Sequence, residues 1–398
     1  MEFIACFALI VILIRLRVPV GLTLFATSIL LTLLEFGFSI RFIEPFQQTV
    51  LDLRTWKMVA TIMIVVTLGE ILSQTGYLER MVAALKAFIS PGMVARIAPA
   101  LIGLLPMPGG AMVSAPIIEE LAKNSPASAD AKTVSNFWWR HIWEPVWPLY
   151  QSVILAAAIL GVSVWQVAFI CFPITLACMA GGYLVIRLPL PKQKSQSRGV
   201  IWFCREMIAS MWPIIFIIMT GIIFKADLII SLLVLFVILF IIRITNIKMV
   251  YTSFKKGFSF DIVMIFLGGL SMMKVIESGQ AATNTLAALQ TWGIPIDLVV
   301  FTLPFLVGLL TGLTAAYVGV GFPIVSSAFI LTGGLNSGIY LAYAGGLMGI
   351  MVSPVHLCLV LTKAYFKAQF GGIFRILIPV VVLTSILVFV TKYLFYPN

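Results

Sequence analysis

The chain has 398 residues, of which 61% are hydrophobic and only 10% are charged. Soluble domains carry about 25% charged residues, so this composition excludes a soluble globular protein and predicts a chain that lies mostly in lipid. The net charge of +11 does not indicate nucleic-acid binding, because the basic residues lie in short loops between apolar segments, as the positive-inside rule describes.

The apolar segments are continuous rather than alternating, which predicts an all-α polytopic membrane protein and not a β-barrel. In chain order, we expect transmembrane spans at 2–14, 18–37, 57–75, 142–161, 165–187, 207–223, 227–242, 260–276, 339–361 and 373–395. Two more apolar stretches, 93–122 and 294–335, are interrupted by Gly and Pro, and we predict that they are re-entrant hairpins. This topology gathers most basic loops in the cytoplasm and places both termini outside.

The two halves of the chain resemble each other at an offset of a little over 200 residues. The matching landmarks, in order, are 74–76 with 277–279, 103–105 with 308–310, 115–117 with 322–324, and 145–146 with 354–355. We therefore predict a first repeat at 1–188, a cytoplasmic linker at 189–206 and a second repeat at 207–398. Each repeat has five spans and one hairpin, and because five is odd, the second repeat is inverted.

The interrupted segments are the predicted substrate site. Pro removes a backbone donor and Gly weakens a helix, so neither 103–118 nor 308–327 can continue as a regular helix. Irregular backbone is tolerated at membrane depth only inside protein or around a wet cavity, and broken helices direct N-termini that attract anions. A kink with only a packing role is the alternative. The predicted substrate-binding residues here are Pro106, Pro108, Gly109, Gly110, Ser114, Thr311, Gly312 and Thr314.

A second pair of breaks follows each hairpin, at Pro145 and Pro148 in the first half and at Pro354 in the second. Pro354 and His356 are added to the predicted substrate site. Glu144 is the predicted coupling residue, because an ionised carboxylate inside the membrane is disfavoured by about 2.5–3.5 kcal/mol and is retained where it has a function.

The residues offer little support for catalysis. HExxH, GxSxG and P-loop patterns are absent from the sequence, so we predict no enzyme, no catalytic residues and no cofactor. His141 and Glu144 have i, i+3 spacing, but no further ligand type clusters with them in the sequence, and we predict no metal site. His141 is compatible with an interfacial position, and the five cysteines are interpreted as small core residues.

The order of these features resembles the ion transporter superfamily, which includes gluconate permeases, the large subunits of tripartite dicarboxylate transporters and divalent anion–sodium symporters. The segments 104–120, LLPMPGGAMVSAPIIEE, and 353–366, SPVHLCLVLTKAYF, resemble an uncharacterised prokaryotic integral-membrane family within it. The resemblance implies a homodimer in which a mobile domain, with substrate between the hairpin tips, moves past a scaffold by an elevator mechanism. Sodium–dicarboxylate relatives carry Ser-Asn-Thr at both tips, which this chain lacks, so coupling to H+ stands beside coupling to Na+.

These observations together predict a secondary active transporter in the cytoplasmic membrane that moves a small organic anion, such as a carboxylate. The expected partners are the substrate, the lipid bilayer and a second copy of the chain, and no nucleic acid. A channel and a membrane-embedded enzyme remain the alternatives.

Overall fold

The computed structural model describes residues 2–105, 110–190, 198–242, 245–279 and 294–397, and every regular element within these ranges is helical. The first half contains α1 (Glu2–Arg15), α2 (Val20–Phe36), η1 (Ile40–Phe42), α3 (Glu44–Leu51), α4 (Leu53–Ser73), α5 (Tyr77–Phe88), α6 (Pro91–Gly103), α7 (Ala111–Leu121), α8 (Ala129–His141), α9 (Gln151–Leu160) and α10 (Val164–Val185). The second half contains α11 (Val200–Ile222), α12 (Leu228–Ile241), α13 (Ile247–Gly257), α14 (Phe260–Ser278), α16 (Ile296–Thr311), α17 (Thr314–Ala316), η2 (Tyr317–Gly321), α18 (Phe322–Ser326), η3 (Phe329–Thr332), α19 (Leu335–Met351), α20 (Leu357–Phe366) and α21 (Phe370–Phe395).

Local sequence sets where many of these helices begin and end. Asp52, Ser128 and Asp227 cap α4, α8 and α12, and each side-chain oxygen accepts a hydrogen bond from a backbone amide in the first turn. Gly161 ends α9 in the left-handed conformation, at φ +66°, which glycine adopts without a steric penalty.

Several helices are long and apolar enough to cross a membrane. They are α4, α10, α11 and α21, and the bent pair formed by 247–255 and 260–278, with a 57° bend, adds a fifth when it is counted as one span. Shorter apolar helices include α2, α12 and α16. The prediction of a multi-pass helical membrane protein is therefore confirmed, whereas the number of ten spans and their orientation stay predictions.

The predicted hairpins correspond to pairs of consecutive helical segments. The stretch 93–122 contains α6 and α7, and the stretch 294–335 contains α16 followed by α17, η2 and α18. We call these groups hairpin 1 and hairpin 2. In each half, a helix interrupted near its middle comes next, α8–α9 in the first half and α19–α20 in the second.

The predicted span at 142–161 starts too late. The broken helix that contains it begins at Ala129, and residues 142–150 are the break rather than the first turns. A search for apolar segments does not find α8, because its sequence ADAKTVSNFWWRH is polar on average. In the structure, however, most residues of α8 are buried by other parts of the protein. A helix covered by other helices does not need the apolar surface that contact with lipid requires.

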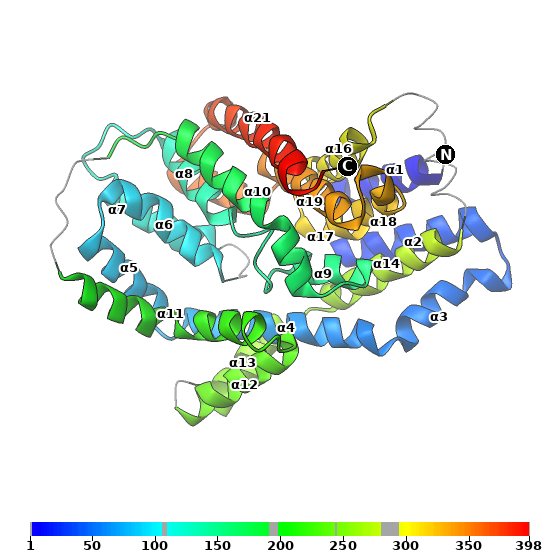
Figure 1. Ribbon diagram of the computed structural model, residues 1–398, viewed down its shortest axis with the longest axis horizontal. Coiled ribbons are helices and arrows are strands. Elements are labelled where there is room, and N and C mark those ends of the chain that lie inside the picture. Colours follow the sequence, from blue (N-terminus) through cyan, green and yellow to red (C-terminus); the bar gives the residue numbers. More distant parts are fainter. Residues whose placement is uncertain (1, 106–109, 191–197, 243–244, 280–293, 398) are drawn as a thin grey trace.

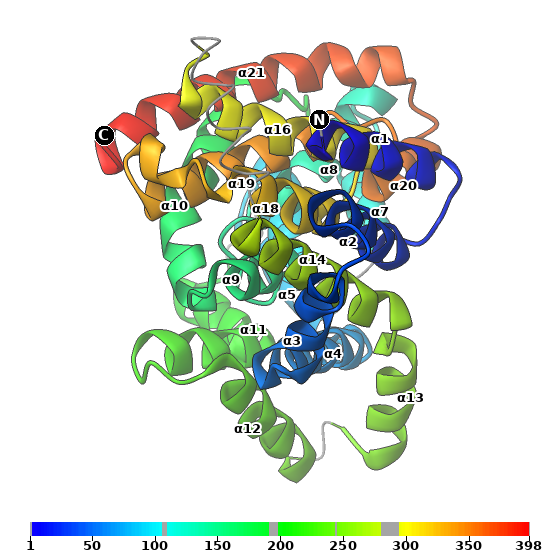
Figure 2. The same cartoon turned by 90° about the vertical axis from the view of Figure 1, so that its right-hand side faces the viewer.

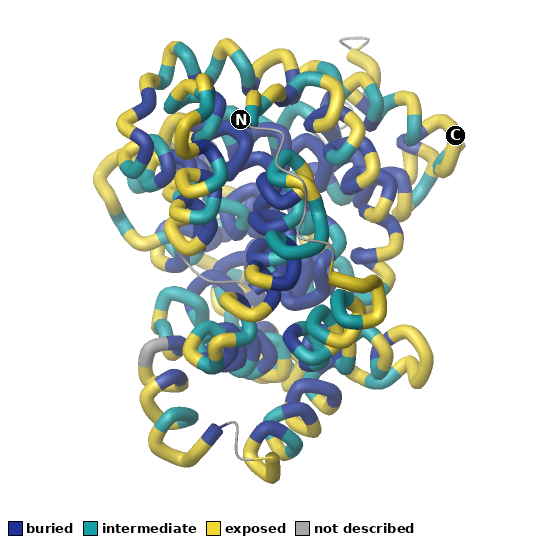
Figure 3. Tube along the Cα trace, turned by 90° about the vertical axis from the view of Figure 1, so that its left-hand side faces the viewer, coloured by how far each residue is buried: buried dark blue, intermediate teal, exposed yellow. Residues whose placement is uncertain are grey.

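The helices form two groups (Figure 1 and Figure 2). The central group contains both hairpins, both broken helices, α10 and α21. In this group α6 packs on α8 and α16 on α19, while α7 also packs on α20, and α17 and η2 on α9. The flanking group contains α1–α5 and α11–α14, with close packing of α2 on α14, of α4 on α13 and of α5 on α11. Figure 3 shows the buried residues concentrated in the middle of the molecule, where 337–351 of α19 are all buried.

Candidate functional site

The first break, residues 142–150, lies inside protein, and side chains of other helices support the backbone that it exposes. In the first break, Tyr343 on α19 donates to the Glu144 carbonyl at 3.3 Å and to the Ser152 hydroxyl at 2.7 Å. Thr175 on α10 donates to the Ile142 carbonyl at 2.8 Å. The bonds to Glu144 and Ile142 satisfy backbone carbonyls that a continuous helix would satisfy itself, as membrane-embedded irregular backbone requires.

Each hairpin contacts a broken helix through a glycine at the end of the hairpin's first helix. A Cβ atom added to Gly103, at the end of α6, would collide with the Arg140 carbonyl. Gly312 ends α16 at φ +65°, and a Cβ atom there would lie 2.7 Å from the His356 amide nitrogen. Only glycine allows approaches this close. The glycines at both positions therefore permit direct contact between a hairpin and a broken helix.

Two histidines face each other at the centre of this arrangement. His141, the last residue of α8, and His356, at the N-cap of α20, have their Nε2 atoms 3.2 Å apart. The Nδ1 atom of His141 lies 2.7 Å from the Phe137 carbonyl oxygen, and that of His356 lies 2.7 Å from the Gly312 carbonyl oxygen. Both side chains are buried. His141, for which the sequence left an interfacial position open, is therefore part of the buried site.

Other polar side chains are buried nearby. The Glu144 side chain is in the first break and is 2% exposed. Asn136 on α8 donates from its amide to the Ala111 carbonyl at the start of α7, at 2.9 Å. Its own side-chain oxygen and the hydroxyl of Ser353 are fully buried and have no partner in the described part of the chain. Buried groups of this kind are expected where a ligand binds.

The remaining predicted residues differ in their surroundings. Ser114 and Thr311 are buried, and their hydroxyls donate to carbonyls of their own helices, at 3.3 Å and 2.7 Å. Gly110 is buried at the start of α7, Thr314 is partly exposed, and Pro354 is exposed. The predicted residues Pro106, Pro108 and Gly109 lie outside the described residues.

Sequence reasoning missed three residues of this site: His141, Asn136 and Cys358. The ligand-forming atoms of His141, His356 and Cys358 all lie within 4.8 Å of one another. The pattern His356-x-Cys358 next to a predicted break was the one sequence feature that could have indicated Cys358 as a site residue. The spacing along the chain could not reveal that the two breaks bring His141 and His356 together.

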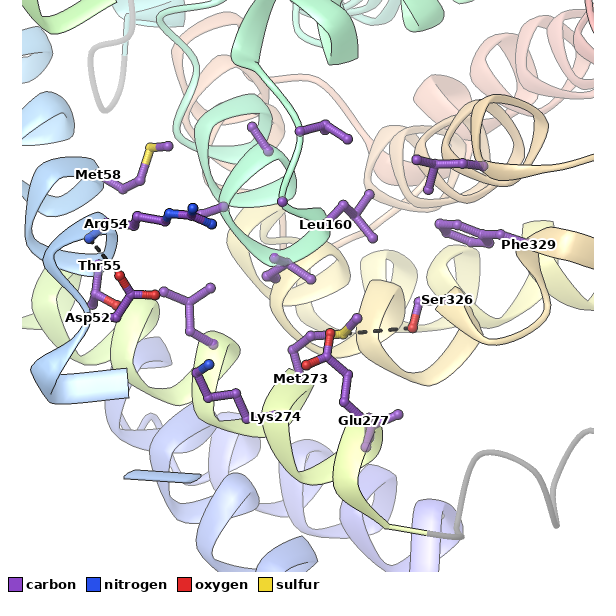
Figure 4. Close-up of a pocket in the computed structure, with 18 of the residues that line it drawn as sticks. Asp52, Arg54, Thr55, Met58, Leu160, Met273, Lys274, Glu277, Ser326 and Phe329 are labelled. Atoms are coloured by element: carbon purple, nitrogen blue, oxygen red, sulfur yellow. Dashed lines mark hydrogen bonds between the residues drawn. The ribbon is translucent and has the colours of Figure 1, made fainter. Parts of the chain in front are cut away.

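A cavity of about 830 Å³ opens elsewhere, between the two groups of helices (Figure 4). Its lining includes residues of α4, α9, α14, α18 and η3, and none of the histidine, glutamate or cysteine side chains described above. Three basic and two acidic side chains line it, which leaves one positive charge in excess. They are Arg54, Lys57, Lys274, Asp52 and Glu277.

This arrangement of helices is similar to that of a solved membrane protein. The crystal structure of the YdaH transporter from Alcanivorax borkumensis has a TM-score of 0.60 to this chain, with 11% sequence identity, and the match covers 95% of this chain and 98% of that one. At this identity the similarity shows a shared fold. No curated protein sequence matches the chain. The profile of one family, described as "Protein of unknown function (DUF401)", matches residues 2–395, and the chain therefore belongs to that family.

Proposed function

We propose that this protein is a secondary active transporter that moves a small organic anion, such as a carboxylate, across the cytoplasmic membrane. The observation that carries the proposal is the meeting of two hairpins with two broken helices around buried polar side chains. Broken helices near the middle of the membrane are the usual location of substrate sites in transporters. The shared fold with a protein described as a transporter supports the same function.

The substrate would bind between the hairpins and the breaks. α9 and α20 each start directly after a break, and α7 starts at Ala111 in hairpin 1, and the partial positive charges at such helix N-termini would attract an anion. The buried Asn136 amide, the Ser353 hydroxyl and His356 add polar groups of the kind that orient a carboxylate. Thr311, Gly312 and Thr314 would contribute at the tip of hairpin 2.

The order of elements supports inverted repeats and an elevator mechanism. Each hairpin packs on the first helix of the broken pair in its own half and on the second helix of the pair in the other half. A two-fold relation between the halves would produce this reciprocal packing. The central group would then move against the flanking group during transport. The flanking group would also form the homodimer interface. The cavity between the two groups would be the entry for substrate.

Glu144 is the proposed coupling residue. Its buried carboxylate would be disfavoured by about 2.5–3.5 kcal/mol if it crossed the membrane ionised, so protonation would favour movement of the central group. A proton bound at Glu144 would thus travel with the substrate. Coupling to Na+ through carbonyl and hydroxyl oxygens near Thr311 and Ser114 is the competing proposal.

Uptake into proteoliposomes tests the function. The purified protein would be reconstituted and supplied with radiolabelled small carboxylates under an imposed pH gradient or Na+ gradient. A secondary transporter accumulates substrate above the external concentration, and accumulation collapses when the gradient is dissipated. Equilibration without accumulation would indicate a channel, and turnover that needs no closed vesicle would indicate an enzyme.

A further inference from the structure

We propose that His141, His356 and Cys358 form a binding site for a transition-metal ion of the Zn²⁺ class. Their ligand-forming atoms come from both broken helices and lie within 4.8 Å of one another. His141 ends α8, His356 is the N-cap of α20, and Cys358 lies in the first turn of α20. Metal binding at this site does not depend on the proposed transport function.

The hydrogen bonds of the two imidazoles define which nitrogen atoms are available. Each Nδ1 atom lies 2.7 Å from a backbone carbonyl oxygen, that of Phe137 or of Gly312. A carbonyl oxygen can only accept, so each Nδ1 carries a hydrogen. The two neutral rings then direct Nε2 lone pairs at each other across 3.2 Å. Two facing lone pairs repel unless a cation lies between them, and a metal ion would supply that cation.

The separation of the two nitrogens fits a tetrahedral metal. Zinc–nitrogen bonds of about 2.0–2.1 Å in tetrahedral geometry place two nitrogen ligands about 3.3–3.4 Å apart, close to the 3.2 Å between His141 and His356. A zinc–sulfur bond of about 2.3 Å places the sulfur about 3.6 Å from each nitrogen, so the Cys358 sulfur would move closer by roughly 1.2 Å at most. Cys358 is only partly buried, which leaves room for that movement.

The supporting contacts are those typical of metal-binding histidines. A ligating imidazole usually donates its other N–H to a carbonyl or carboxylate, which fixes the tautomer and the ring orientation. Phe137 provides such a carbonyl and also packs its ring against both imidazoles, with centroid distances of 4.6 Å to His141 and 5.4 Å to His356. Gly312 links the same network to the tip of hairpin 2.

The ligand types select the class of metal. Two imidazoles and a thiolate favour borderline and soft ions such as Zn²⁺ over Mg²⁺ or Ca²⁺, which prefer oxygen ligands. Three protein ligands leave the fourth tetrahedral position open, as in zinc sites that bind an exchangeable ligand. If the proposed function is correct, a carboxylate of the substrate can occupy that position.

A titration with Co²⁺, which reports tetrahedral coordination by its visible absorption, tests the site directly. Purified full-length protein in detergent would be treated with a chelator, dialysed and titrated with Co²⁺. We expect one Co²⁺ per chain, visible bands of a tetrahedral ion, and a near-ultraviolet band from thiolate-to-cobalt charge transfer. Excess Zn²⁺ should remove all these bands, because Zn²⁺ binds more tightly than Co²⁺ in the usual order of affinities.

Variants then assign the ligands. Cys358→Ser should lose the charge-transfer band, whereas Cys204→Ser, which removes an exposed cysteine, should keep it. His356→Ala should weaken binding by more than the about 10–100-fold that loss of a supporting group causes. His356→Cys should restore binding and add a second thiolate contribution, which separates the loss of a ligand from misfolding.

Several outcomes would overturn the proposal. The wild-type protein could bind Co²⁺ no more tightly than His356→Ala, which would mean that the imidazoles share a proton instead of a metal. The charge-transfer band could survive in Cys358→Ser, which would exclude this thiolate. Because binding is measured in detergent without substrate, these results are independent of whether the protein transports an anion.

Discussion

The substitution Gly312→Ala is the most informative single change at the site. Gly312 ends α16 at φ +65°, and its carbonyl holds the His356 ring. An added Cβ atom would lie 2.7 Å from the His356 amide nitrogen, 2.9 Å from the His356 Cα atom and 3.0 Å from the Ser353 hydroxyl. Two of these three neighbours are backbone atoms, so a change of rotamer cannot relieve the contact.

Two effects set the size of the response. A non-glycine residue in the left-handed conformation costs roughly 1–2 kcal/mol, and overpacking in a filled interior typically costs about 1–3 kcal/mol. The matched control is Gly76→Ala, because Gly76 has φ +74° and an added Cβ atom would have no neighbour within 4 Å. Gly76→Ala should therefore show the conformational penalty alone, and Gly312→Ala should lose about 2–5 kcal/mol in total.

The assay compares thermal stability and transport for both variants. Gly76→Ala should lose a little stability and keep transport near the wild-type rate. Gly312→Ala should either separate hairpin 2 from the second break or displace His356, and transport should be lost while the protein still inserts and purifies. If the two variants behaved alike in both measurements, the contact between Gly312 and the break would not matter for function.

Three further predictions follow from other features. Glu144→Gln, which mimics the protonated carboxylate, should keep exchange of substrate but lose accumulation driven by a pH gradient; accumulation at the wild-type level would make Glu144 structural. Asp297→Ala removes the carboxylate that pairs with the fully buried Lys392 at 2.9 Å, and this variant should reduce the free energy of unfolding by about 3–5 kcal/mol. The double variant Asp297→Leu/Lys392→Met should recover part of that loss, and equal stability of the single and double variants would contradict this prediction. Single cysteines at Ser195 and Asn398, which both lie outside the described residues, should be labelled from opposite sides of the membrane, and labelling from one side would reject the topology.

Glycine and proline allowed the interruptions of the helices to be predicted from the sequence, whereas the re-entrant geometry of 93–122 and 294–335 stays a prediction. Their local effect on helices is strong and does not depend on tertiary context. Hence 93–122 and 294–335 each hold more than one helical segment, and the interruption at Pro354 lies between α19 and α20.

The composition of the site could not be predicted in the same way. His141 and His356 are 215 positions apart in the chain, and single-sequence patterns carry no information about contacts at such a distance. The polar helix α8 was also missed, because a search for apolar spans assumes that a membrane helix faces lipid. Its buried residues Asn136 and His141 are covered instead by hairpin 1 and the second broken helix.

The reciprocal packing of the hairpins has a consequence for biogenesis. Hairpin 1 packs on α20 of the second half, and α9 of the first half packs on hairpin 2. Each half therefore lacks part of its packing surface until the other half has been synthesised. We therefore expect the N-terminal half alone to leave Glu144 and the end of α8 without their protein cover. Separate expression of the two halves should yield unstable fragments, and co-expression should restore an assembled protein.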